Sequence, residues 1–207
     1  MRAYMVAAEK LRAVVEQDYA AFALGEKYYG AVHTWGYTHE LLNRLGMNAS
    51  DELHKKLFKA ACGGGCPLLL TPGYFPGAGE TVVDLGCGAG HDCILAAKFV
   101  GPTGRVIGID LTQKMLDRAS QNVAELAPDC APVIEFKRGL LDDGSMLKGL
   151  VDENVADLVM SNGVFNLTTD KAAAFRSAFR VLKPGGRFHL CDLCKVEEPV
   201  VDTAAAA

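Results

Sequence analysis

Three glycines in the segment Asp84-Leu-Gly86-Cys-Gly88-Ala-Gly90 are spaced to make a tight turn between a strand and a helix. Glycine has no Cβ, so such a turn can bring its backbone close to a ligand. Asp110 follows 20 residues after Gly90, at the expected end of the next strand. In a doubly wound sheet, a carboxylate at that position can accept hydrogen bonds from both hydroxyls of a ribose. The combination predicts a site for a cofactor that contains a nucleoside.

Strand and helix patterns alternate on both sides of this turn. Alternation of this kind predicts a parallel sheet covered by helices on both faces. We therefore expect an α/β, doubly wound, Rossmann-like domain with strand order 3-2-1-4-5, and a ligand at the switch point between the first and fourth strands. Strands are expected at 81–85, 105–110, 133–136, 156–161 and 187–193, and helices at 90–100, 112–126 and 169–182.

The first 79 residues have a different pattern and are predicted to be an N-terminal helical segment that folds over the carboxyl ends of the strands as a lid. Helices are expected at 4–24, 38–46 and 50–61, followed by a loop at 62–80 that holds six Gly and three Pro. Tyr29 is a candidate lid residue that would exclude water, with packing between helices as the alternative. Residues 80–194 are expected to form the cofactor-binding domain and 195–207 a tail.

Composition and charge narrow the class of protein. The chain has 207 residues, of which 50% are hydrophobic, and 21 basic against 25 acidic residues give a net charge of −4. This balance argues against a basic nucleic-acid footprint. We expect neither a membrane helix nor a secretory signal. The seven Cys are read as free thiols in a reducing compartment, which predicts a cytoplasmic protein.

Four stretches are more specific than the glycine turn alone. They are VVDLGCGAG, VIGIDLTQKMLDRA, ADLVMSNGVFNL and RVLKPGGRF, which together extend from about Val82 to Asp192. The first has the spacing G-x-G-x-G, with an Asp two residues before it, in place of the dinucleotide pattern G-x-G-x-x-G. The set resembles the motifs of class I S-adenosylmethionine-dependent methyltransferases. The resemblance implies that fold and S-adenosyl-L-methionine as the cofactor.

The same resemblance implies which residues bind the cofactor. Asp110 would hold the ribose hydroxyls and Leu111 would touch the adenine. Leu141 and Asp142 would flank the adenine ring and its amino group. Core packing is the alternative role for the two leucines. The residues implied around the methionine part are Asp84, Gly86, Cys87, Gly88, Gly90, Ser161 and Asn162.

Two longer stretches, GHDCILAAKFVGPTGRVIGIDLT and SNGVFNLTTDK, resemble arsenite methyltransferases. In that family thiolates bind trivalent arsenic, which is soft and prefers sulfur ligands. Cys62 and Cys66 lie in the loop where the family places its first thiol, so the resemblance makes them candidates to contact the substrate. Asn166 follows the fourth strand, where an acceptor would dock, and could orient it. Gly163 stands where the family has a second Cys, which keeps a quinone or another small-molecule C- or O-methyltransferase open as the alternative.

The cysteines leave open an alternative in which some of them bind a metal ion. A four-thiolate metal site could form from two cysteine pairs, Cys62 with Cys66 and Cys191 with Cys194. Inward packing of Cys191 is the preferred interpretation, and no metal is predicted.

Only about 14 residues follow Leu193, too few for the sixth and seventh strands that such methyltransferases usually carry. We therefore expect an open edge beside the fifth strand that a homodimer could cover, and a non-catalytic cofactor-binding relative is the alternative to an enzyme.

Overall fold

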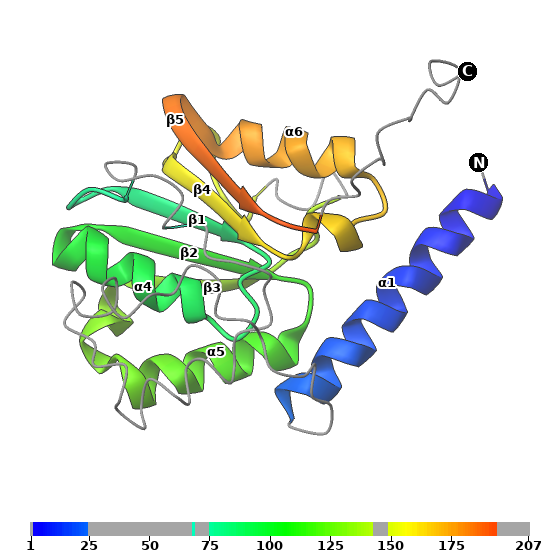
Figure 1. Cartoon of the computed structure of the whole chain (residues 1–207), viewed down its shortest axis with the longest axis horizontal. Helices are drawn as coiled ribbons and strands as arrows, with labels where there is room; N and C mark the ends of the chain where they lie inside the picture. Colours follow the sequence, from blue (N-terminus) through cyan, green and yellow to red (C-terminus); the bar gives the residue numbers. More distant parts are fainter. Residues whose placement is uncertain (1, 25–67, 69–74, 143–148, 194–207) are drawn as a thin grey trace, which may run out of the picture.

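A computed structural model of the chain describes residues 2–24, 68, 75–142 and 149–193. The helices expected at 38–46 and 50–61 lie outside the described residues. So do Tyr29, Cys62, Cys66 and Cys194, and the expectations that depend on them stay predictions. The described part is a sheet with helices on both faces and a long N-terminal helix beyond one end of the strands (Figure 1).

The sheet has five parallel strands in the order β3-β2-β1-β4-β5, as the sequence pattern predicts. Strand β1 lies at the centre, and its last four residues are fully buried between the two helical layers. A parallel strand buried on both faces needs a nearly continuous apolar run, which explains why this strand lacks polar alternation. The strands are β1 (Thr81–Leu85), β2 (Arg105–Asp110), β3 (Ile134–Arg138), β4 (Ala156–Asn162) and β5 (Leu182–Cys191).

Three strands differ from their predicted limits, and β4 differs only by ending one residue later, at Asn162. Strand β3 continues to Arg138 because its last residues still pair with the end of β2. Strand β5 starts at Leu182, before the Pro-Gly-Gly sequence that was predicted to precede it, and ends at Cys191. The pairing partner on β5 jumps from Leu182 to Arg187 as β4 advances from Ala156 to Leu158. The Pro-Gly-Gly sequence therefore lies inside the strand, where the pairing with β4 is irregular.

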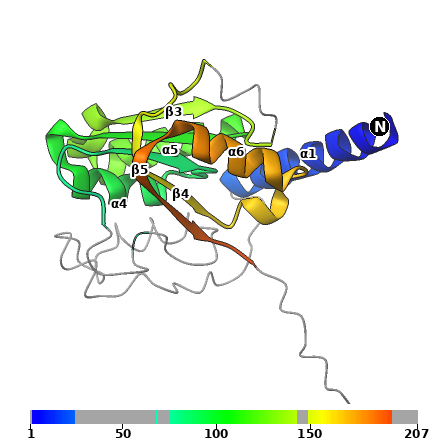
Figure 2. The same ribbon diagram turned by 90° about the horizontal axis from the view of Figure 1, so that it is seen from above.

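Helices α4 (His91–Val100) and α5 (Gln113–Leu126) cover one face of the sheet, and α6 (Lys171–Val181) covers the other (Figures 1 and 2). Asp170 is the N-cap residue of α6, and its carboxylate accepts a hydrogen bond from the N–H of Ala173 at 2.9 Å, a favoured capping arrangement. Short 3-10 turns precede β2 and β3 and follow β4; the last of these is η3 (Phe165–Leu167).

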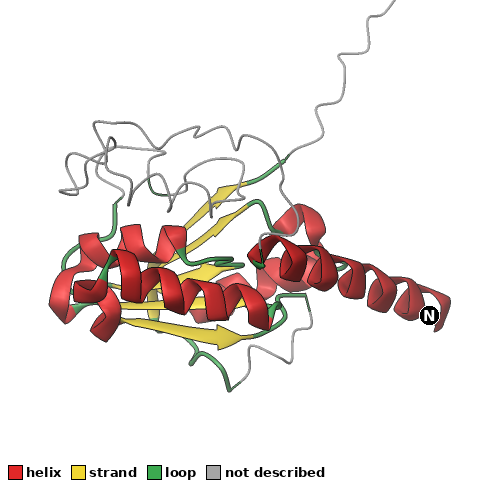
Figure 3. Ribbon diagram, turned by 90° about the horizontal axis from the view of Figure 1, so that it is seen from below, coloured by secondary structure: helices red, strands yellow, loops and turns green. Residues whose placement is uncertain are grey.

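The N-terminal helix α1 (Arg2–Ala23) stands beyond the carboxyl ends of the central strands and packs against α5 (Figures 1 and 3). The ends of parallel strands, the turns that follow them and this helix therefore meet in one region. None of the helices in the described ranges has the length and apolar character that crossing a bilayer requires.

Candidate functional site

The turn after β1 is held by the end of β2. The N–H groups of Gly86 and Cys87 both donate to the carbonyl oxygen of Ile109, at 2.7 and 2.9 Å. Gly86 has a φ of 80°, which L side chains rarely adopt. The N–H of Gly88 donates to Oδ2 of Asp110 at 2.9 Å. The glycine turn and the acidic residue predicted from the sequence thus form one hydrogen-bonded unit.

Asp110 is held at both of its oxygens. Oδ1 accepts from the N–H of Thr112 at 2.8 Å, while Oδ2 accepts from Gly88. Thr112 stands at the N-cap position of α5 as expected, but its side chain makes no capping hydrogen bond to that helix. Burial raises the pKa of the Asp110 carboxyl, and the N–H donors oppose this effect. A carboxylate has several acceptor sites, and the hydrogen bonds from Gly88 and Thr112 leave part of this capacity for the hydroxyl groups of a ligand.

Asp84 and two thiols lie beneath the turn and are buried. Asp84 is 2% exposed, and the thiol of Cys93 donates to its carboxylate at 3.2 Å. Burial and the nearby Asp92 raise the pKa of Asp84 well above its ordinary value. Burial also raises the pKa of Cys87 to about 11. These groups shape the turn from below, and a thiol in such surroundings is not a nucleophile at neutral pH.

The third glycine of the motif faces a helix. Gly90 has a φ of 80°, and a Cβ there would lie 3.0 Å from the Cβ of Ala119 on α5. The side chain of Asn122, also on α5, donates to the carbonyl of Ala89 at 2.9 Å. Gly90 therefore permits close packing between the turn and α5.

The end of β4 forms the opposite wall. Ser161 is fully buried and donates to the carbonyl of Leu85 at 2.6 Å, which ties β4 to the end of β1. The next residue, Asn162, donates from its side-chain amide to Asp92 at 3.1 Å. Gly163 follows with a φ of 68°, and its N–H donates to the carbonyl of Cys191. Val164 then lies over Gly86, because a Cβ built on Gly86 would be 2.2 Å from a Val164 methyl carbon.

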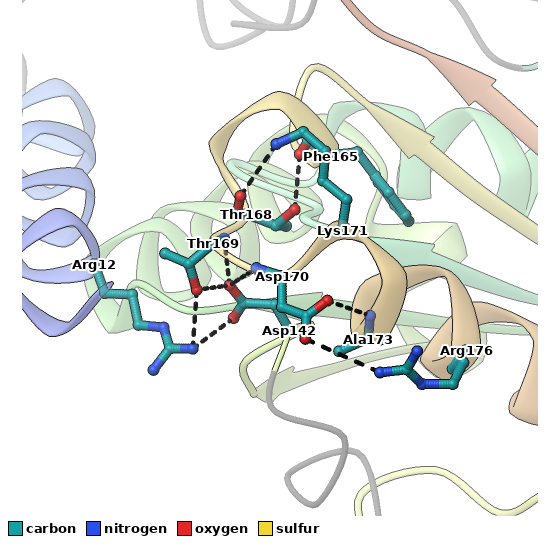
Figure 4. A network of polar contacts seen from close by, with 9 residues as sticks. All are labelled: Arg12, Asp142, Phe165, Thr168, Thr169, Asp170, Lys171, Ala173 and Arg176. Atoms are coloured by element: carbon teal, nitrogen blue, oxygen red, sulfur yellow. Dashed lines mark hydrogen bonds and ion pairs between the residues drawn. The ribbon is translucent and has the colours of Figure 1, made fainter. Parts of the chain in front are cut away.

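Asp142, after β3, is the centre of a polar network (Figure 4). Its Oδ2 accepts from the N–H and hydroxyl of Thr169 and from the N–H of Asp170. Its Oδ1 accepts from the guanidinium of Arg12 on α1 at 3.2 Å. The side chain of Asp142 is 2% exposed and that of Arg12 is 30% exposed. This carboxylate joins the segment after β3, the start of α6 and the N-terminal helix.

The Asp142 network is expected to stabilise the fold in a pH-dependent way. Burial alone would raise the pKa of Asp142, but hydrogen bonds from Thr169 and the charge of Arg12 outweigh it and lower that pKa. A lowered folded-state pKa means that the stabilisation is present above about pH 4 and is lost as the pH falls below it. Urea unfolding should show that Asp142→Asn costs about 1–3 kcal/mol at pH 6. The difference should shrink toward pH 3, and a cost independent of pH would contradict this assignment.

A pocket opens between these walls. Seven of the residues predicted to bind the cofactor line it, whereas Asp84, Cys87, Gly90 and Ser161 lie behind its wall. Asn166 is on η3 outside the lining, where its N–H donates to Asp192. The predicted residues that line the pocket are Gly86, Gly88, Asp110, Leu111, Leu141, Asp142 and Asn162.

Other lining residues were not predicted. Arg12, Val15 and Tyr19 come from one face of α1 and close the pocket on the side away from the sheet. Only the spacing of these three residues could have indicated from the sequence that they line a pocket. The spacing places them on one face of a helix but does not show what that face contacts. The remaining unpredicted lining residues are Thr112, Gly139, Leu140, Gly163, Val164, Leu167 and Thr168.

Metal ligation is not supported within the part of the chain that the structure describes. There, no group of three or more His, Cys, Asp or Glu side chains is placed to hold a metal ion. Cys191 is half-buried at the end of β5. The four-thiolate arrangement itself involves residues outside the described ranges and is not tested.

Comparisons with known proteins agree on one class. The family described as "Methyltransferase domain" matches residues 76–206. Arsenite methyltransferase of Halobacterium salinarum is 46% identical over 115 residues, which are 56% of this chain and 27% of that protein. Demethylmenaquinone methyltransferase of Lactobacillus johnsonii is 32% identical over 124 residues, 60% of this chain and 48% of that protein.

A solved structure is similar as well. The arsenic(III) S-adenosylmethionine methyltransferase CrArsM from Chlamydomonas reinhardtii superposes with a TM-score of 0.60 at 32% identity. The match covers 73% of this chain and 48% of that one. This chain therefore spans between about a quarter and a half of the length of these relatives.

Proposed function

Because this chain belongs to the methyltransferase domain family and has the fold of the class I S-adenosylmethionine-dependent enzymes, we propose that it transfers a methyl group from S-adenosyl-L-methionine to a small molecule. The observation that carries the proposal is the unit formed by Asp110 and the glycine turn. Asp110 holds Gly88 in place and retains acceptor capacity toward the pocket.

The pocket residues fit the cofactor that the family implies. The Asp110 carboxylate would hold the ribose hydroxyls, and Leu111 and Leu141 offer apolar walls for a nucleobase. Gly86 and Gly88 bring bare backbone to the lining beside Asn162, where a methionine part would lie. When bound, the cofactor supplies an electrophilic methyl group on its sulfonium. The chain itself then contributes orientation and exclusion of water, which is the main requirement of an in-line displacement.

Arsenite is the first candidate acceptor. Its support is the likeness to arsenite methyltransferases and the affinity of trivalent arsenic for thiolates. Cys62 and Cys66 are proposed to contact this acceptor, Asn166 to orient it, and Tyr29 to belong to a lid formed by residues 1–79. Residues 80–194 would be the cofactor-binding domain and 195–207 a tail.

A quinone or another organic acceptor is the second candidate. Gly163 lines the pocket where arsenite methyltransferases have a Cys, so this position offers no thiolate to arsenic. The likeness to demethylmenaquinone methyltransferase supports the same alternative. A non-catalytic cofactor-binding protein is the outcome if binding occurs without transfer.

Titration calorimetry with S-adenosylmethionine and S-adenosylhomocysteine tests the cofactor half of the proposal. One-site binding is expected, and a folded protein that binds neither compound would overturn it. Methyl transfer to arsenite or to a demethylquinol, followed as S-adenosylhomocysteine produced, then distinguishes the acceptors. Cofactor binding with no transfer to any acceptor would favour the non-catalytic alternative.

We further propose a cytoplasmic homodimer that binds no nucleic acid. The free thiols Cys87, Cys93 and Cys130 suit a reducing compartment, and the net charge of −4 disfavours nucleic acid. Among the described strands, β5 pairs only with β4, and Phe179 on the adjacent α6 is 78% exposed. Light scattering coupled to size-exclusion chromatography should give twice the chain mass of 22.1 kDa. A monomeric mass at high concentration would refute the dimer.

A further inference from the structure

Helix α1 closes the pocket with one face. Arg12, Val15 and Tyr19 all line the cavity, and their spacing of three and four residues places them on the same side of the helix. Arg12 is the only cation among the lining residues that the structure describes. It reaches Asp142, which lines the part of the pocket beside Leu141, and it also donates to the hydroxyl of Thr169 at 3.1 Å.

The two oxygens of Asp142 have different partners. Oδ2 accepts three hydrogen bonds from Thr169 and Asp170, and these fix the carboxylate at the start of α6. Among the described residues only Arg12 donates to Oδ1. Oδ1 is therefore the oxygen that a ligand could use, and because Arg12 itself lines the pocket, a ligand group on Oδ1 must share that oxygen with the guanidinium or displace it. Figure 4 shows Arg12 approaching Asp142 from the side opposite α6.

We propose that Arg12 competes with the 6-amino group of the cofactor's adenine for Oδ1 of Asp142. The proposal rests on the proposed function, in which Asp142 flanks the adenine amino group. Binding of the cofactor then displaces Arg12, and the helix that carries it acts as a gate at the base end of the pocket. Arg12 also lowers the selectivity of the pocket for adenine over a base with a 6-oxo group, because the guanidinium can donate a hydrogen bond to that oxygen.

Two features of the closed position favour exchange of the contacts that hold the gate. Nε of Arg12 is buried, and no acceptor within the described ranges reaches it, so the closed position leaves one donor unsatisfied. A second ion pair joins Glu16 of α1 to Arg138 at 2.5 Å, and Arg138 also donates to the carbonyl of Leu111. The side chains of this second pair are 40% and 51% exposed, so solvent screens it.

The test compares two ligands that differ at one position of the base. S-adenosylhomocysteine has the 6-amino group, and S-inosylhomocysteine has a 6-oxo group there. Calorimetry on the full chain should show that Arg12→Met, which keeps the length of the side chain but removes its donors, binds S-adenosylhomocysteine about fivefold more tightly. The same variant should bind S-inosylhomocysteine no better than the wild type, because the carboxylate then faces a carbonyl oxygen.

Glu16→Gln is the matched control. It loosens the same helix through the Glu16–Arg138 pair but leaves the Asp142 contact in place, so it should affect both ligands equally. An unchanged ratio of the two affinities in Arg12→Met, or weaker binding of both, would overturn the gate while leaving the proposed function intact. If neither the wild type nor Arg12→Met binds S-adenosylhomocysteine in a sample that unfolds cooperatively on heating, the proposed function itself fails, and the gate with it.

Discussion

Replacement of Asp110 by alanine is expected to weaken binding of S-adenosylhomocysteine at least about 100-fold, because hydrogen bonds to a charged acceptor contribute roughly 1.5–3 kcal/mol each. Two effects combine in this variant. The ribose hydroxyls lose their acceptor, and the turn loses the carboxylate that holds the N–H of Gly88. Titration calorimetry on the purified chain measures the change directly.

Asp110→Asn is the control that separates these effects. Its side chain has the same shape and retains one oxygen, so it can accept from either Gly88 or Thr112 but not from both. We expect a loss of about tenfold for this variant, since one charged hydrogen bond is removed. Cooperative thermal unfolding must be retained in both variants. An unchanged dissociation constant in a folded Asp110→Ala protein would show that this carboxylate does not bind the cofactor.

The arrangement of the sheet could be predicted because it depends on local patterns. Alternating strands and helices allow few topologies once parallel crossovers are right-handed, and the observed order β3-β2-β1-β4-β5 confirms the prediction. The start of β5 was predicted wrongly, because Pro184, Gly185 and Gly186 normally mark a turn. In the structure, a register shift against β4 accommodates them within the strand. A single sequence does not show which neighbour will tolerate such a shift.

The site was predicted only in part, for a similar reason. The motif identifies glycines but not what each of them approaches, so Gly90 was assigned to the cofactor although it faces Ala119 on α5. Asp84 was expected to orient the backbone near the methionine amino group, and the structure places it buried below the turn. The contribution of Arg12 depends on a contact with a residue 130 positions away. Contacts between elements so distant in sequence follow from packing and leave no local pattern.

Gly86→Ala is expected to weaken cofactor binding at least about 30-fold. The backbone conformation at this position costs an L residue about 1–2 kcal/mol. The added methyl group also requires Val164 to move. A Cβ at this position would lie 2.2 and 2.6 Å from the two methyl carbons of Val164. Both residues line the pocket, so Val164 has to shift into the space that the cofactor would occupy, or η3 has to move as a whole.

Two further variants separate strain from the steric conflict. Gly101→Ala introduces a methyl group at a φ of 66° where nothing lies within 4 Å, so it should lower the free energy of unfolding without changing the affinity for S-adenosylhomocysteine. The double variant Gly86→Ala/Val164→Ala should recover part of the lost binding, because the contacts with the two methyl carbons disappear, while a Cβ contact of 2.9 Å with residue 164 and the backbone strain remain. If the double variant binds as poorly as Gly86→Ala, the close approach of Val164 to the turn is not what limits the pocket. The backbone of Gly86 itself would then be the element that the cofactor requires.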